Sequence, residues 1–183
     1  AHRRVMARLR DHRLHELLST GHPLDHFARM TEVPEAGEGR VEVGHGLSLA
    51  TVHTRHSELC YGALLYLHGA PLLGWTADSG YEPRVYAALS EAPLVVVDAR
   101  RGASPEHAGF AEVARLARAP HMAGRTLLLT GYGSQGVEAP DEGEVAALGE
   151  SVVVARPGLR LVLAPAGQAA RSPDKCEAAL CVA

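Results

Sequence analysis

Two uninterrupted apolar runs constrain the fold of this chain more than any other feature. They are Pro93–Val97 (Pro-Leu-Val-Val-Val) and Thr126–Thr130 (Thr-Leu-Leu-Leu-Thr). Neither run alternates apolar with polar residues, which is typical of strands buried on both faces of a sheet. An amphipathic helix is expected between them, over His107–Ala119, with one apolar face formed by Phe110, Val113, Leu116 and Ala117. The pattern predicts a domain of the α/β class.

Shorter segments fill the rest of the chain. Helices are expected over residues 3–18 and over Pro83–Ser90, and residues 137–144 are expected to form an acidic loop. Two short strands are expected over Arg40–Val43 and Leu47–Val52. Two hairpins are also expected, one formed by Tyr61–Leu67 with Leu72–Ala77 and the other by Ser151–Ala155 with Leu159–Leu163. No repeat or clear linker divides these segments. We therefore expect one domain over residues 1–165 and a polar tail over residues 166–183.

The composition disfavours several classes of function. Apolar residues make up 46% of the 183 residues and charged residues 21%, as in an ordinary globular protein. The net charge of −3 gives no electrostatic reason to expect a nucleic acid or a membrane surface as the partner. No apolar run approaches the length of a membrane span. Three scattered cysteines are too few for a disulfide framework, so a reducing, cytoplasmic setting is expected.

Asp78 is the strongest candidate for a functional residue. It lies in the segment Leu72–Tyr81, where an apolar run breaks into a glycine turn, so its carboxylate is expected at the end of a buried strand. An unpaired buried charge is costly, and a metal ion is the partner that best explains this one. The alternative is a turn residue that caps the backbone amides after it.

Three other residues stand at the edges of expected strands or helices. His56 precedes the central hairpin, and His53 could take its place after a small change of register. Asp98 ends a buried strand, either as an acid that supports a site or as a cap. His107 opens the expected helix, either as a helix-start residue or as an acid.

The glycine-rich run that follows the second buried strand is a weaker signal. Gly131–Gly136 lacks the lysine and hydroxyl residue of a phosphate loop. Tyr132 stands where a nucleophile elbow around Ser134 would need glycine. A serine-hydrolase site is therefore not favoured.

Taken in order, five motifs resemble the second half of the metallo-β-lactamase fold, in its ribonuclease-Z-like and phosphodiesterase-like branch. The resemblance spans roughly residues 1–165 and includes the closing strands over Val152–Leu163. The motifs are Thr54-Arg55-His56-Ser57, Trp75-Thr76-Ala77-Asp78-Ser79-Gly80-Tyr81, Leu94-Val95-Val96-Val97-Asp98-Ala99, His107-Ala108-Gly109-Phe110-Ala111-Glu112 and Leu127-Leu128-Leu129-Thr130-Gly131.

This resemblance implies a fold and a chemistry. The fold would be an αββα sandwich, of which this chain supplies mainly the C-terminal half. In the family two metal ions, usually zinc, activate a bridging hydroxide. The matching positions make His56 a ligand to one ion, Asp78 the carboxylate that bridges both ions, and His107 a general acid near the leaving group.

Two departures from the family pattern decide the expected function. Gly131 stands where the family's last histidine ligand is expected, and the cluster His-x-His-x-Asp-His is absent. Its nearest match, Gly21-His22-Pro23-Leu24-Asp25-His26, is a coincidence on our interpretation, which puts the first half of the fold upstream of residue 1. We therefore expect a degenerate, non-catalytic binding or scaffold subunit. The alternative is a metal-dependent hydrolase of phosphodiester or related ester bonds, with its missing ligands supplied by an upstream half or a partner chain.

A half-sandwich has a further implication. It would expose a sheet edge and an apolar face, and natural proteins normally cover both. A protein partner or upstream half-chain that completes the sandwich is therefore expected. Zinc, as one or two ions in an incomplete site, is the expected cofactor.

Overall fold

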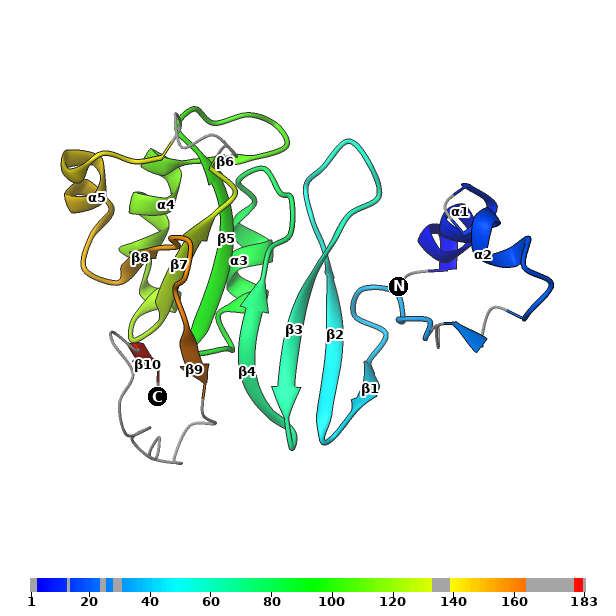
Figure 1. Ribbon diagram of the computed structural model, residues 1–183. Coiled ribbons are helices and arrows are strands. Elements are labelled where there is room, and N and C mark those ends of the chain that lie inside the picture. The colour runs from blue at the N-terminus through cyan, green and yellow to red at the C-terminus, as the bar shows by residue number, and fades with distance from the viewer. Residues whose placement is uncertain are drawn as a thin grey trace.

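One mixed sheet organises the chain in the computed structural model, which describes residues 3–12, 14–23, 26–27, 31–132, 139–163 and 180–182. The sheet has 8 strands in the order β1-β2-β3-β4-β5-β7-β8, with β6 paired to β5 (Figure 1). Its strands are β1 (Arg40–Gly44), β2 (Leu47–His53), β3 (Tyr61–Leu67), β4 (Ala70–Trp75), β5 (Leu94–Arg100), β6 (Ala108–Gly109), β7 (Thr126–Thr130) and β8 (Val152–Val154).

The first half of the sheet is antiparallel and its turns explain why. His45-Gly46 joins β1 to β2 and His68-Gly69 joins β3 to β4, and all four residues have positive φ. Two central residues with positive φ give the turn whose twist matches a two-strand hairpin. The β2–β3 register runs from Leu47↔Leu67 to His53↔Tyr61. The strands predicted in this region are confirmed.

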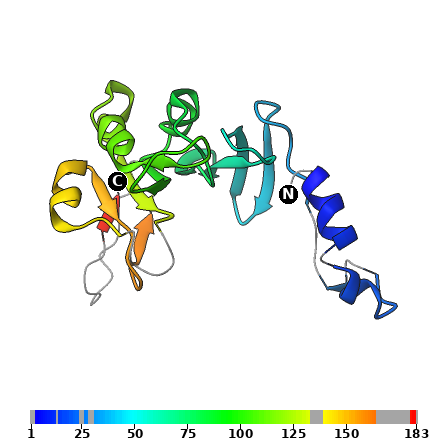
Figure 2. The same ribbon diagram turned by 90° about the horizontal axis from the view of Figure 1, so that it is seen from above.

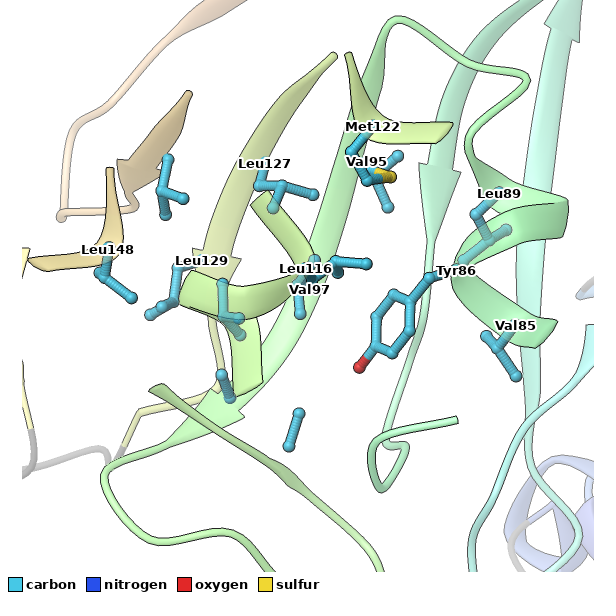
Figure 3. Close-up of a cluster of buried hydrophobic side chains, with 14 of the residues drawn as sticks. Val85, Tyr86, Leu89, Val95, Val97, Leu116, Met122, Leu127, Leu129 and Leu148 are labelled. Atoms are coloured by element: carbon cyan, nitrogen blue, oxygen red, sulfur yellow. The ribbon is translucent and has the colours of Figure 1, made fainter. Parts of the chain in front are cut away.

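The second half of the sheet is parallel, and helices pack on one face of both halves. The helices α3 (Pro83–Leu89), α4 (Phe110–Ala117) and α5 (Glu142–Leu148) contribute to a core with one set of alternate strand residues (Figures 1 and 3). Gly74 in β4 lets α3 approach closely, because a Cβ atom there would lie 2.9 Å from the Leu89 Cβ. The labelled core residues of Figure 3 include Tyr86, Leu89, Val95, Val97, Leu116, Leu127 and Leu129.

The opposite face of the sheet is apolar as well. Leu94 and Leu128 are its buried centre, flanked by partly buried Leu73, Val96 and Val153. The strand β9 (Leu161–Leu163) packs on this cluster, and Figure 2 shows it on the side of the sheet away from α4. Trp75 pairs with Val96, so it lies on the same face, and it is 48% exposed. We call this surface the open face.

The N-terminal residues form two helices where one was predicted. They are α1 (Arg3–His12) and α2 (His15–Leu18), and α1 buries no residue. Both views place them beyond the β1 edge, away from α3, α4 and α5 (Figures 1 and 2). None of the helices in the described residues combines the length and apolar character that crossing a membrane requires.

The structure corrects the prediction in the C-terminal third. The expected acidic loop contains the start of α5, whose N-cap Asp141 accepts a hydrogen bond from the Glu144 amide at 2.8 Å. The expected final hairpin is wrong, because β8 pairs in parallel with β7 and β9 pairs in parallel with β10 (Leu180–Val182). The β10 strand falls within the segment predicted as a polar tail, most of which lies outside the described residues.

Candidate metal centre

The parallel strands bring the candidate residues to one edge of the sheet. Both β4 and β7 pair in parallel with β5. Asp78 follows β4, Asp98 lies near the end of β5, and Gly131 follows β7. Asp98 is opposite Thr130 in the register. Because the carboxyl ends of parallel strands meet at one edge, these three positions are neighbours in space.

Two buried hydroxyl groups fix the turn that carries Asp78. The Thr76 hydroxyl accepts a hydrogen bond from the Asp98 amide at 3.0 Å and donates one to the Ala77 carbonyl at 2.9 Å. The Ser79 hydroxyl donates to the Gly80 carbonyl at 2.9 Å and accepts from the Arg55 amide at 3.3 Å. Ala77 has a φ of 50°, an uncommon conformation for a residue with a side chain. The turn therefore presents an exposed Asp78 on a well-fixed backbone.

A loop after β5 returns His107 to the same edge. The Ser104 hydroxyl accepts hydrogen bonds from the amides of Glu106 and His107, and the Ala108 amide donates to the Ser79 carbonyl at 3.1 Å. His107 therefore precedes α4 instead of opening it, since that helix begins at Phe110. The helix predicted from residue 107 is three residues too long at its start.

Asp98 and His107 form the closest polar contact of the site. The His107 Nδ1 lies 2.6 Å from Asp98 Oδ2, and the Asp98 side chain is only 7% exposed. Arg100 Nε is 3.8 Å from the other carboxylate oxygen, Oδ1. A buried carboxylate needs such partners, because an isolated charge there is strongly disfavoured. Asp98 is thus a fixed acid of the site, one of the two roles that its sequence left open.

Gly131 occupies the position where the family pattern expects a histidine. Its φ is 79°, in the left-handed region that favours glycine. A Cβ atom built on Gly131 would collide with Asp98 Oδ1. The Asp98 carboxylate therefore lies in the space that a side chain at 131 would need. A histidine ligand at this position would require Asp98 to move.

His56 has a different environment from the one predicted. Its Nδ1 accepts a hydrogen bond from the Glu58 amide at 3.1 Å, and its Nε2 lies 4.0 Å from Glu106 Oε2. A neutral imidazole that accepts at Nδ1 carries its proton at Nε2, which faces Glu106 at a distance too long for a hydrogen bond. His53 is exposed at the end of β2 and stacks edge-on against Tyr61 at 5.6 Å.

Among the described residues, two groups place three potential ligand atoms within 4.8 Å of one another. One is Asp78, Asp98 and His107, and the other is His56, Glu106 and His107. The structure thus brings Asp78 and His56 each close to His107 but divides them between the groups. With no side chain at Gly131 and His56 hydrogen-bonded through Nδ1, these residues do not fit the family's two-metal centre.

Glu106 is the member of the second group that sequence reasoning missed. The pKa of its carboxyl group is held below the ordinary value by a hydrogen bond with Ser57, with smaller contributions from His56 and His107. The only signal in the sequence was its position beside His107. The roles of Thr76 and Ser79 were not predicted either, although both residues lie in the same short segment as Asp78. Ser134 and Asp25 lie outside the described residues.

Comparisons with known proteins support the fold and no narrower relationship. No protein-family model and no curated protein matches the chain. The metallo-beta-lactamase fold protein YhfI from Bacillus subtilis matches it with a TM-score of 0.56 at 18% identity, over 77% of this chain and 58% of that one. Igni18, a metallo hydrolase from the archaeon Ignicoccus hospitalis, matches with a TM-score of 0.55 at 15% identity, over 80% and 64%.

The chain thus spans less than two thirds of the length of either solved structure. Identities of 15% and 18% establish the fold and leave activity open. The expectation that the chain forms the C-terminal half of a sandwich is compatible with this coverage and stays a prediction. The α/β class and the sheet with helices on one face agree with both structural matches. The chain has the metallo-β-lactamase fold.

Proposed function

We propose that this chain is a non-catalytic metallo-β-lactamase-fold module that binds a protein partner across its open face. The observation that carries the proposal is the position of Asp98, whose carboxylate fills the space beside Gly131. Two-metal hydrolysis needs ligands that hold two ions close enough to share an activated hydroxide. Here one ligand position has no side chain, and the acid beside it is already engaged with His107 and Arg100.

The open face supports the binding role. Leu73, Val96 and Val153 are only partly buried there, and Trp75 beside them is about half exposed. An apolar surface that the described residues leave partly uncovered is typical of a site that another protein covers. The partner would be a second chain or an upstream half-chain that adds the other layer of the sandwich.

A second candidate function is a metal-dependent hydrolase of phosphodiester or related ester bonds. The proximity of Asp78, Asp98 and His107 favours it, since two carboxylates and an imidazole can hold a catalytic ion. The structural match to Igni18, described as a metallo hydrolase, agrees with it at the level of the fold. Zinc, as one or two ions, would then be the cofactor, with the missing ligands supplied from outside this chain.

Hydrolysis of bis(p-nitrophenyl) phosphate by the intact protein tests the proposal. The protein would be loaded with zinc and, in a separate experiment, with manganese. We expect no release of nitrophenol above that of the metal ion alone. Turnover that Asp78→Asn removes, and that the exposed control Glu42→Gln keeps, would establish the hydrolase and overturn the proposal.

A further inference from the structure

We infer that the cleft between α1 and the loop joining β2 to β3 binds a small anionic amphiphile, which is an apolar chain with a carboxylate or phosphate head. The cleft has a volume of about 640 Å³. A volume of this size is typical of small-molecule sites. The inference goes beyond the proposed function, because the cleft shares no residue with the open face or with either group of potential metal ligands.

The apolar part of the lining comes from both sides of the cleft. Val5 and Leu9 line it from α1, one helical turn apart, and Leu59 lines it from the loop. The loop is closed at its base by Thr54, whose amide and hydroxyl both donate to the Cys60 carbonyl, at 3.3 and 3.1 Å. The helix α1 buries none of its residues, and Leu59 is 37% exposed. An apolar chain in the cleft would remove this apolar surface from water.

The polar part of the lining is mainly basic. Arg4, Arg8 and His12 follow one another at intervals of four residues, so they lie on one face of α1, and all three line the cleft. Glu58 is the only acid among the described residues of the lining. The cleft therefore has an excess of basic over acidic groups, which favours an anionic ligand.

The helix α1 gains little stability from its own residues. It has 10 residues, fewer than an isolated helix normally needs in water, and buries none of them. Arg4 and Arg8 form a like-charge pair four residues apart, and no acid stands in the first turn to balance the positive end of the helix dipole. The last turn, with Arg10 and His12, agrees with the dipole. An anionic head beside Arg4 and Arg8 would offset the repulsion in the first two turns.

The two kinds of lining residue together define the ligand. A guanidinium group binds the oxygens of a carboxylate or a phosphate through two parallel hydrogen bonds. An inorganic anion would leave the apolar residues of the cleft uncovered, and a neutral apolar molecule would leave the arginines without an anion. One molecule that carries both parts satisfies the whole lining. Because Val5 and Leu9 line a cleft that the loop closes on its other side, a free amphiphile fits better than a flat membrane surface.

Isothermal titration calorimetry of the intact protein with decyl phosphate, kept below the concentration at which it forms micelles, tests the site. We expect one molecule bound per chain, and much weaker binding of decanol and of inorganic phosphate. Arg8→Gln should reduce the affinity about 10–100-fold, because it removes hydrogen bonds between charged groups. The matched control is Arg10→Gln, at an exposed arginine of the same helix that does not line the cleft, and it should leave the affinity unchanged. Leu59→Ala should weaken binding by reducing the apolar contact.

Any of four results would overturn the inference. They are no binding of decyl phosphate by the unaltered protein, equally tight binding of decanol, equal affinities of Arg8→Gln and Arg10→Gln, and binding confined to vesicles of phosphatidylglycerol, which would indicate a membrane surface instead. Circular dichroism of each variant separates lost binding from lost folding. None of these measurements involves the open face or hydrolysis, so this site and the proposed function can fail independently.

Discussion

At the scale of single residues, the Asp98 carboxylate occupies the space that a side chain at position 131 would need. Gly131 has a left-handed backbone, and any side chain there would collide with the Asp98 carboxylate. Asp98 in turn depends on His107, 2.6 Å away, to offset a charge that is almost fully buried. A substitution at any of these three residues should therefore change the position of the other two.

Gly131→Ala should destabilise the protein by more than the backbone strain alone. The left-handed conformation costs an L-residue about 1–2 kcal/mol, and overpacking against Asp98 should add about 1–3 kcal/mol. Gly124→Ala is the matched control, because Gly124 has a φ of 71° and nothing within 4 Å of its Cβ position. Urea unfolding of both variants measures the difference. Equal destabilisation would show that Asp98 does not occupy this space.

His107→Gln should lower the free energy of unfolding by about 1.5–3 kcal/mol, as for other hydrogen bonds to a charged group. The cause is the loss of the partner of a carboxylate that is 7% exposed. His121→Gln, at an exposed histidine, should change stability little. Both would be measured in the presence of a chelator, so that any bound ion is removed from the comparison. If the two variants unfold at the same urea concentration, the contact at Asp98 contributes nothing.

At the scale of elements, the site depends on how β4, β5 and β7 end. The Thr76 hydroxyl joins two of these ends, since it accepts from the Asp98 amide and donates to the Ala77 carbonyl. Thr76→Val should cost about 1–3 kcal/mol, because it leaves a buried amide without its acceptor. Thr126→Val in β7 is the control. Equal losses of stability in the two variants, measured by thermal unfolding, would show that the Thr76 hydroxyl does not stabilise the Asp98 amide.

The sequence predicted the elements whose signals are local. The paired runs that became β3 and β4 flank a His-Gly turn, and β5 and β7 are uninterrupted apolar runs. It failed for α5, where the acids of residues 137–144 suggested a loop although Asp141 and Glu144 cap each other's backbone amides. The partners of β8 and β9 were also wrong, because short strands do not specify which neighbour they pair with.

The candidate site was predictable residue by residue but not as a constellation. His56, Asp78 and His107 all lie at the predicted edge, because each follows or precedes a recognisable strand or helix. The contact between Asp98 and His107 depends on a loop between β5 and α4 whose course no periodic pattern describes. The hydrogen bond from the Glu58 amide to His56 could not be predicted either, because a backbone donor leaves no signal in the residue pattern.

At the scale of the whole molecule, the described helices cover one face of the sheet, and the open face carries apolar residues that are only partly buried. Trp75 is its single tryptophan and lies on the open face at 48% exposure. Acrylamide should therefore quench the tryptophan fluorescence of the isolated chain strongly. Quenching should weaken, and emission should move to shorter wavelength, when the proposed partner is bound. Equal quenching in both preparations would contradict a partner on this face.

The central claim is that the Asp98 carboxylate takes the space of a ligand side chain at position 131, so that this chain alone does not form a two-metal centre. The most direct test is a crystal structure of the zinc-soaked protein with anomalous data collected at the zinc absorption edge. We predict that no pair of neighbouring peaks appears beside Asp78, Asp98 and His107, and that His56 keeps its hydrogen bond from the Glu58 amide. Two peaks, with His56 ligating one ion and Asp78 bridging both, would contradict the claim.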